Sequence, residues 1–93
     1  MTKVMMDIDK RNNIMFDCQN HAEDHDACTI MSTLCNVLVE SCFRIGEEPT
    51  IYNKGHVRID ISLAQDDTVE VFETVMAVMK QAAKMQPEFI KIY

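Results

Sequence analysis

The amino-acid sequence predicts a single α+β domain over residues 1–93, in which about five mostly antiparallel strands pack with two helices in the order ββαββαβ. Two observations lead to this prediction. Several short segments alternate apolar and polar residues and are separated by turn-forming residues, as in strands that pair in hairpins. Two longer segments instead repeat apolar residues every three or four positions, as in helices that cover a sheet.

The first hairpin is predicted over residues 2–9 and 13–19. Apolar and polar residues alternate in both segments, and the intervening "DKRNN" is rich in turn-forming residues. The side chains expected to point inward are Val4, Met6, Ile8, Ile14, Phe16 and Cys18. The polar stretch "NHAEDHD" then leads into the first helix.

Residues 27–44 have the apolar period of an amphipathic helix. The apolar stripe consists of Ala27, Met31, Leu34, Leu38 and Cys42. Asp26 is the expected N-cap, because an aspartate oxygen can accept a hydrogen bond from a free N–H of the first turn. Cys28 then falls in the first turn, at the border between the apolar stripe and the polar face, where a side chain can face a cleft.

The second half of the chain repeats this arrangement. A second hairpin is predicted over residues 50–63, turning at "NKG". Its inward side chains would be Val57, Ile59, Ile61 and Leu63. Residues 66–86 form the second predicted helix, with Asp67 as N-cap and Glu70 completing a capping box. A proline ends this helix, and "EFIKIY" is the last short strand.

The composition narrows the functional class. The chain is 47% hydrophobic and has a net charge of −6. This acidity argues against nucleic acid, whose binders neutralise phosphates with basic side chains, and suits a basic polypeptide partner. No apolar run could span a membrane, and the N-terminal segment does not resemble a secretion signal. We therefore expect a cytoplasmic protein without membrane association, whose four cysteines are reduced thiols or metal ligands.

The most informative stretch is "CQNHAEDHDACTIMS", which combines two cysteines with two histidines. Cys28 could be a catalytic nucleophile in this stretch. A free thiol is only about 3% thiolate at pH 7, and a helix N-terminus stabilises the thiolate by only about 0.3–1 kcal/mol. A nearby imidazolium is therefore needed, and either His21 or His25 could supply it.

Two other interpretations remain open at this point. The cysteines could be core residues, since Cys35 shares a side of the helix with Cys28, and Cys18 alternates inward. Alternatively, zinc could bind a group of thiolate and imidazole ligands, namely Cys18, His21, His25 and Cys28. The zinc site would require Cys18 to leave its inward-facing register.

The segment "NHA…DACTIMSTLCNVLV" resembles the family of ribosomal-processing cysteine proteases, Prp. In that family a Gly-His-Ala ends the second strand, and a mobile loop leads to a helix start with an aspartate, a cysteine and, one turn later, a serine. The matching residues here are His21, Ala22, Asp26, Cys28 and Ser32, with Asn20 in the position of the glycine. Asparagine tolerates positive φ better than most residues, so the backbone shape can be kept.

The resemblance implies a cysteine endopeptidase that needs no cofactor. His21 would be the general base and Cys28 the nucleophile, with Asp26 and Ser32 supporting the site. The backbone N–H groups of Cys28 and its neighbours would be the candidate oxyanion donors. Members of the family are small cytoplasmic homodimers that remove a short N-terminal extension from a large-subunit ribosomal protein. Phage-borne relatives act on capsid or scaffold proteins.

This sequence departs from the family pattern in two further respects. The loop from His21 to Cys28 is several residues shorter than in the family, and the segment from Asp26 to Cys28 lacks one residue. A shorter loop changes which peptide fits. A non-catalytic relative that binds a peptide is therefore the alternative to an active enzyme.

Overall fold

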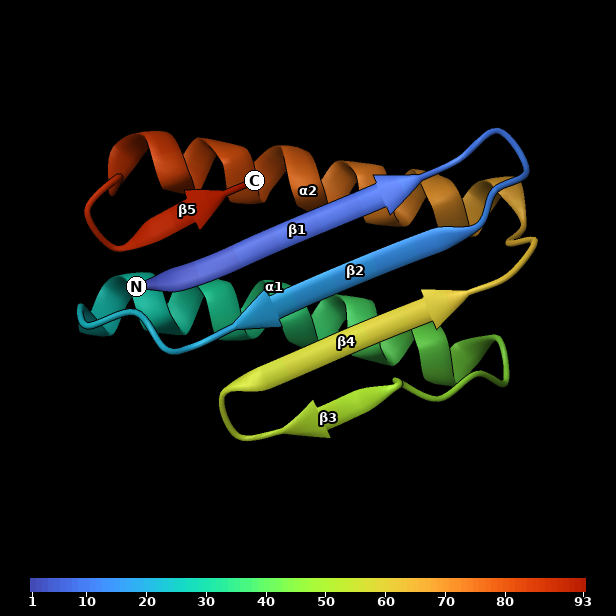
Figure 1. Cartoon of the computed structure of the whole chain (residues 1–93), viewed down its shortest axis with the longest axis horizontal. Coiled ribbons are helices and arrows are strands. Elements are labelled where there is room, and N and C mark those ends of the chain that lie inside the picture. The colour runs from blue at the N-terminus through green and yellow to red at the C-terminus, as the bar shows by residue number, and fades with distance from the viewer.

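The computed structural model describes residues 1–93 and has the predicted element order ββαββαβ. One sheet, in the spatial order β3-β4-β2-β1-β5, is formed by strands β1 (Thr2–Ile8), β2 (Ile14–Gln19), β3 (Ile51–Asn53), β4 (His56–Ile61) and β5 (Ile90–Ile92). The helices are α1 (His25–Arg44) and α2 (Asp66–Met85). Both helices cover the same face of the sheet and leave the other face open (Figure 1). No helix combines the length and hydropathy needed to cross a membrane.

The pairing of the strands is mostly antiparallel, as the sequence predicts. β1 with β2, β2 with β4 and β3 with β4 are antiparallel pairs, whereas β5 runs parallel to β1. β4 and β5 therefore run in the same direction, and α2 is the crossover that joins two parallel strands. This crossover brings the end of α2 to the end of the molecule where α1 begins (Figure 1).

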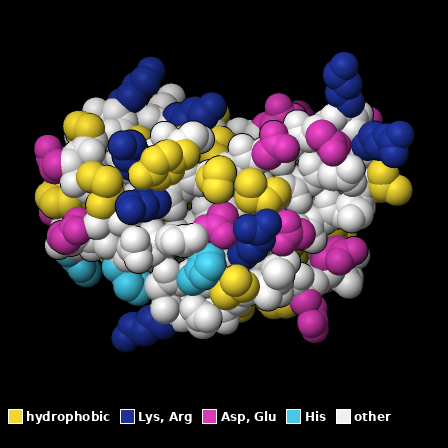
Figure 2. Space-filling view, viewed as in Figure 1, with side chains coloured by type: hydrophobic (Ala, Val, Ile, Leu, Met, Phe, Trp, Pro, Cys, Tyr) yellow, Lys and Arg dark blue, Asp and Glu magenta, His cyan; other side chains and the backbone are white.

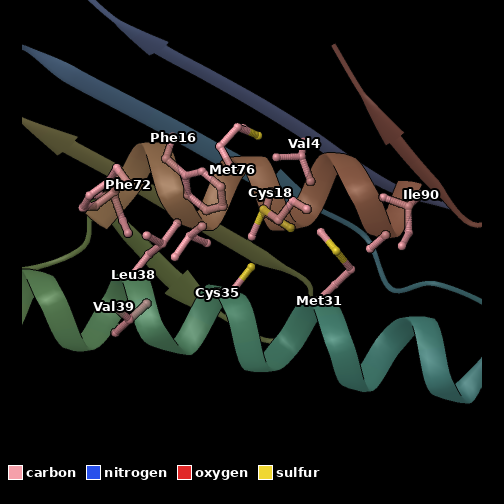
Figure 3. Close-up of a cluster of buried hydrophobic side chains, with 14 of the residues drawn as sticks. Val4, Phe16, Cys18, Met31, Cys35, Leu38, Val39, Phe72, Met76 and Ile90 are labelled. Carbon is pink, nitrogen blue, oxygen red and sulfur yellow. The ribbon is translucent and has the colours of Figure 1, made fainter. Parts of the chain in front are cut away.

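The core lies between the sheet and the two helices. Val4 and Phe16 from the sheet are fully buried together with Leu38 of α1 and Phe72 of α2 (Figure 3). Three of the four cysteines also belong to this core, as small apolar side chains do: Cys18, Cys35 and Cys42. Alternation in the strands and helical periodicity therefore predicted the buried face of these elements.

Two predictions about the second half of the chain are wrong. The capping box at Asp67 does not form, because α2 begins at Asp66 and its N-cap is Gln65, two residues before the predicted one. The Asp67 carboxylate instead accepts a hydrogen bond from the Thr68 N–H. Leu63 does not point inward but is 70% exposed. β4 ends at Ile61, and Leu63 has a φ of +52° in the turn that follows, so the alternation of the strand does not reach it.

The open face of the sheet carries a buried charge. Asp17 in β2 is only 6% exposed, although it alternates with the inward-facing residues of that strand. Its carboxylate accepts hydrogen bonds from His56 Nε2 at 3.1 Å, Arg58 Nη1 at 3.5 Å and Gln19 Nε2 at 3.0 Å. Burial raises the pKa of Asp17, but these hydrogen bonds and the charges of His56 and Arg58 outweigh it, so the pKa lies below its ordinary value.

We expect Asp17→Asn to lower the free energy of unfolding by about 1–3 kcal/mol near neutral pH, because His56 and Arg58 lose a charged acceptor. A carboxyl group whose pKa is lowered by folding stabilises the fold above its unfolded-state pKa, and this contribution is lost as the pH falls through the folded-state value. The difference between variant and wild type should therefore shrink below about pH 4. Urea unfolding across this pH range measures the difference, with Glu48→Gln, at an exposed carboxylate outside the sheet, as control. A difference that is the same at neutral and at low pH would contradict the prediction.

Candidate active site

A cleft opens between α1, the loop after β2 and the β3–β4 hairpin, with a volume of ≈ 160 Å³. The polar side chains and thiols that line it include His21, Cys28, Ser32, Asn36, Tyr52, Lys54 and His56. None of its 15 lining residues is acidic, although the chain as a whole has a net charge of −6. The lining of the cleft therefore offers no like charge that would oppose a thiolate.

The structure brings His21 and Cys28 together in this cleft. His21 Nδ1 lies 3.8 Å from Cys28 Sγ, within the reach of a hydrogen bond to sulfur. His21 is exposed and Cys28 is half-buried, so a bound molecule can reach the thiol while the imidazole exchanges a proton with it. His25, the other histidine of the loop, is the exposed first residue of α1 and makes no hydrogen bond to Cys28. Of the two possible partners, the geometry therefore favours His21.

His21 is held in place by its neighbours in the loop and the hairpin. Asn20 has a φ of +70°, in the left-handed region that asparagine tolerates. Its N–H donates to the Gly55 carbonyl at 2.8 Å, and its carbonyl accepts from Thr2 Oγ1 at 3.2 Å. The His21 ring lies against Gly55, where an added Cβ would be 3.6 Å from Nε2. The turn between β3 and β4 therefore packs directly against the imidazole.

Cys28 is held in place by the first turn of α1. Asp24 is the N-cap of this helix, and its Oδ2 accepts a hydrogen bond from the Ala27 N–H at 3.1 Å. The Cys28 N–H donates to the Asp24 carbonyl at 2.9 Å. Because this N–H is already used within the helix, the expectation that it is an oxyanion donor is not supported. Ser32 and Asn36 follow Cys28 at intervals of one turn and bring a hydroxyl and an amide to the same cleft.

The residues expected to support the site differ in their positions. Ser32 is exposed and lines the cleft, whereas Ala22 is buried in the core beside the loop. Asp26 is exposed and makes no side-chain hydrogen bond, and its predicted role as N-cap is wrong. α1 begins before Asp26, because the extended backbone of Asp24 places the earlier carboxylate over the free N–H groups of the first turn.

The side chains of Asn36, Tyr52 and Lys54 also line the cleft and were not predicted from the sequence. Asn36 follows Ser32 by one helical turn, and this spacing is the sequence signal that could have placed it in the cleft. Tyr52 and Lys54 reach the cleft from the β3–β4 hairpin. No local pattern indicates these two, because only the tertiary fold brings the hairpin beside α1.

The alternative zinc site is not assembled. Cys18 keeps its inward register in β2 and faces Cys35 of α1 (Figure 3). No three side chains of the types that bind metals are grouped so that they could hold a metal ion. The hydrogen bond with Cys18 and burial raise the pKa of Cys35, and burial raises the pKa of Cys42 to about 11. Cys35 and Cys42 are therefore neutral thiols of the core. Cys18 and Cys35 border the cleft from the core, and Cys28 is the one cysteine that is not buried.

No family model and no curated protein matches the sequence, but solved structures do. The ribosomal processing protease Prp from S. aureus, in complex with a covalently linked product peptide, matches with a TM-score of 0.80 and 19% identity over 99% of this chain and 97% of that chain. The same protease with a substrate peptide matches with a TM-score of 0.80 and 17% identity, over 100% and 98% of the two chains. SMU.848 from Streptococcus mutans matches with a TM-score of 0.76 and 20% identity, over 99% and 96%. The chain therefore has the fold of these proteins, and the resemblance seen in the sequence is confirmed at the level of the fold.

The site geometry predicts the reactivity of each thiol. Near pH 7, iodoacetamide should label Cys28 faster than the buried cysteines, and His21→Ala should slow this labelling by about tenfold, because the thiolate loses its imidazolium partner. The difference in the labelling rate of Cys28 between wild type and His21→Ala should disappear above about pH 9, where a free thiol ionises without help. Peptide mass spectrometry measures each rate, and His25→Ala is the matched control. If Cys28 is labelled as slowly as Cys35, or if its labelling rate is the same in His21→Ala as in wild type, the pairing is ruled out.

Proposed function

We propose that the chain is a cysteine endopeptidase related to the ribosomal processing protease Prp, with Cys28 as nucleophile and His21 as general base. The observation that carries the proposal is the separation of 3.8 Å between His21 Nδ1 and Cys28 Sγ in an open cleft. The fold that the chain shares with Prp supports it over almost the whole length of both chains. All four cysteines are free thiols, as is usual in a reducing compartment, so the proposal includes a location in the cytoplasm.

In the proposed reaction, Cys28 passes its proton to His21 and attacks the carbonyl carbon of the scissile peptide bond. When the tetrahedral intermediate collapses, the C–N bond breaks and the imidazolium of His21 gives its proton to the leaving amine. A water molecule then attacks the thioester, with His21 as base, and this step releases the carboxylate product and restores the thiol. The Ser32 hydroxyl and the Asn36 amide are the side-chain donors on the Cys28 side of the cleft that can stabilise the oxyanion.

The proposed substrate is an extended polypeptide, in particular the N-terminal extension of a large-subunit ribosomal protein. The two matching Prp structures are complexes with a product peptide and a substrate peptide. In this chain β3 is an edge strand, and Tyr52 and Asn53 of β3 line the cleft. A peptide can therefore pair its main chain with this edge while its side chains enter the cleft. The net charge of −6 would accelerate the approach of a basic ribosomal protein.

Cleavage by active-site variants tests this proposal. Cys28→Ser should abolish cleavage, and His21→Ala should slow it by about 100-fold or more, the usual contribution of a general base. The substrates are a precursor of a large-subunit ribosomal protein with its extension and, as the phage-type alternative, a capsid or scaffold precursor, followed by mass spectrometry. His25→Ala should retain nearly full activity as the matched control. Continued processing by Cys28→Ser would refute the proposal. Binding of the extension without cleavage, unchanged by alanine at positions 21 and 28, would identify a non-catalytic relative.

We also propose that the chain forms a homodimer through the open face of its sheet. Lys3, Met5 and Asp7 follow one another along β1 on this face, because alternate side chains of a strand share a face. Met5 is 46% exposed, and Tyr93 beside it is 62% exposed. Figure 2 shows this face, where hydrophobic side chains gather near the middle among charged ones. Contiguous exposed apolar surface of this kind is typical of a protein interface.

The charges on the open face fit a second copy of the same face. Lys3 lies beside Lys91 at one end of the face, and Asp7 lies about 13 Å further along β1. The pairing of the strands puts Asp60 at the same end as Asp7, but the Asp60 carboxylate is paired with Arg58 Nε at 2.9 Å, so Asp7 is the acidic group there that a second copy would meet. A two-fold axis that runs across the strands places the basic end of one copy over the acidic end of the other, with Met5 on Met5. The face is therefore self-complementary, as an isologous interface requires.

Charge reversal tests this interface. Lys3→Asp should raise the dimer dissociation constant by about tenfold or more, because it places like charges opposite each other. The double variant Lys3→Asp with Asp7→Lys should restore the dimer, since the two ends of the face then exchange their charges in both copies. Sedimentation equilibrium at low salt measures the constant, with Lys84→Asp on the exposed side of α2 as control. A wild-type monomer at every concentration, or no recovery in the double variant, would exclude this interface.

A further inference from the structure

Gln86 connects the end of α2 to the helix that carries Cys28. It is the C-cap of α2, and its side-chain Nε2 donates a hydrogen bond to Asp24 Oδ2 at 3.3 Å. The same carboxylate oxygen accepts the Ala27 N–H at 3.1 Å, and the Asp24 carbonyl accepts the Cys28 N–H at 2.9 Å. One amide side chain from a distant segment therefore contacts the residue that begins α1.

The hydrogen bond to Asp24 leaves the other polar atom of the Gln86 side chain without a partner. Its Oε1 is buried and has no hydrogen-bond partner, and it is the single side-chain atom of the chain in this situation. A buried amide oxygen without a partner is unfavourable, so the orientation of the amide needs a reason. Rotating the amide by half a turn would place its oxygen against the Asp24 carboxylate, where two acceptors repel. The hydrogen bond to Asp24 therefore determines which way the amide points.

The backbone of Gln86 is fixed on both sides. Its N–H donates to the Ala82 carbonyl at 2.9 Å, and its carbonyl accepts from the N–H groups of Phe89 at 3.1 Å and Ile90 at 3.2 Å. The residue is thus held by the last turn of α2 and by the turn into β5. A side chain on such a rigid base can hold the residue that it contacts.

These contacts define both ends of the loop that carries His21. At its start, Asn20 is bonded to Gly55 and Thr2. At its end, Asp24 is bonded to Gln86. The separation between His21 and Cys28 depends on both ends, because the loop between them is short and has no secondary structure of its own.

We propose that Gln86 is a positioning residue for the His21–Cys28 pair, acting through Asp24 on the start of α1; this inference rests on the proposed function. By fixing Asp24, Gln86 sets the position of the first turn and therefore the distance from Cys28 Sγ to His21 Nδ1. A purely structural role would affect stability alone. A positioning role affects the reactivity of the thiol, and only while His21 is present.

A double-mutant cycle on the labelling of Cys28 separates these roles. Gln86→Ala should slow iodoacetamide labelling near pH 7 by about fivefold and move the pH profile upward, but should change the rate less than about twofold in the His21→Ala background. Gln86→Glu should slow it at least as much, because a second carboxylate then faces Asp24. Gln81→Ala, at an exposed glutamine of the same helix, is the matched control and should have no effect.

Each result has one meaning. If Gln86→Ala lowers the melting temperature while the pH profile of labelling stays that of wild type, the residue is structural and the proposal is overturned. The same conclusion follows if its effect is equally large without His21. If the cycle shows the expected coupling but no peptide or precursor is cleaved, the positioning role stands and the proposed peptidase function fails. If Gln86→Ala does not fold, Gln86→Glu in the same cycle provides the answer.

Discussion

The candidate site depends on one constraint, the short connection between β2 and α1. Only residues 20–24 separate the strand from the helix, so a shift of either element moves His21 relative to Cys28. Hydrogen bonds hold both ends of this connection, to the β3–β4 turn and β1 at one end and within the first turn of α1 at the other. The packing of the sheet against α1 therefore sets the distance between the His21 and Cys28 side chains, and the loop only connects the two elements.

Features that depend on neighbours along the chain could be predicted from the sequence, and features that depend on distant contacts could not. Alternation predicted the inward face of β2 and hence the burial of Cys18. The composition of the loop indicated a histidine partner for Cys28, and the family resemblance indicated that this partner is His21. Asp24 and Asp26 have the same capping chemistry, however, and only Asp24 has a partner in Gln86. Leu63 continues an alternating pattern, but its N–H is bonded to the Asn13 side chain at 2.9 Å, in a turn that no local pattern reveals.

Charge is distributed unevenly between the surface and the cleft. The net charge of −6 belongs to the exterior, since no acidic residue lines the cleft. The one carboxylate buried in the sheet, Asp17, lies on the opposite face and is hydrogen-bonded there by His56 and Arg58. An acidic exterior can therefore attract a basic polypeptide while the cleft itself remains compatible with a negatively charged nucleophile.

The parallel pairing of β5 with β1 determines when the site can form during synthesis. It joins Thr2 to Ile90, and contacts between residues so far apart in the chain carry a large loop-closure entropy and form late. Gln86 precedes β5 by a short turn, so its contact with Asp24 depends on the same late event. A nascent chain would expose Cys28 well before its surroundings are complete. Until β5 has docked, the contact of Gln86 with Asp24, which we propose positions Cys28, is not yet in place.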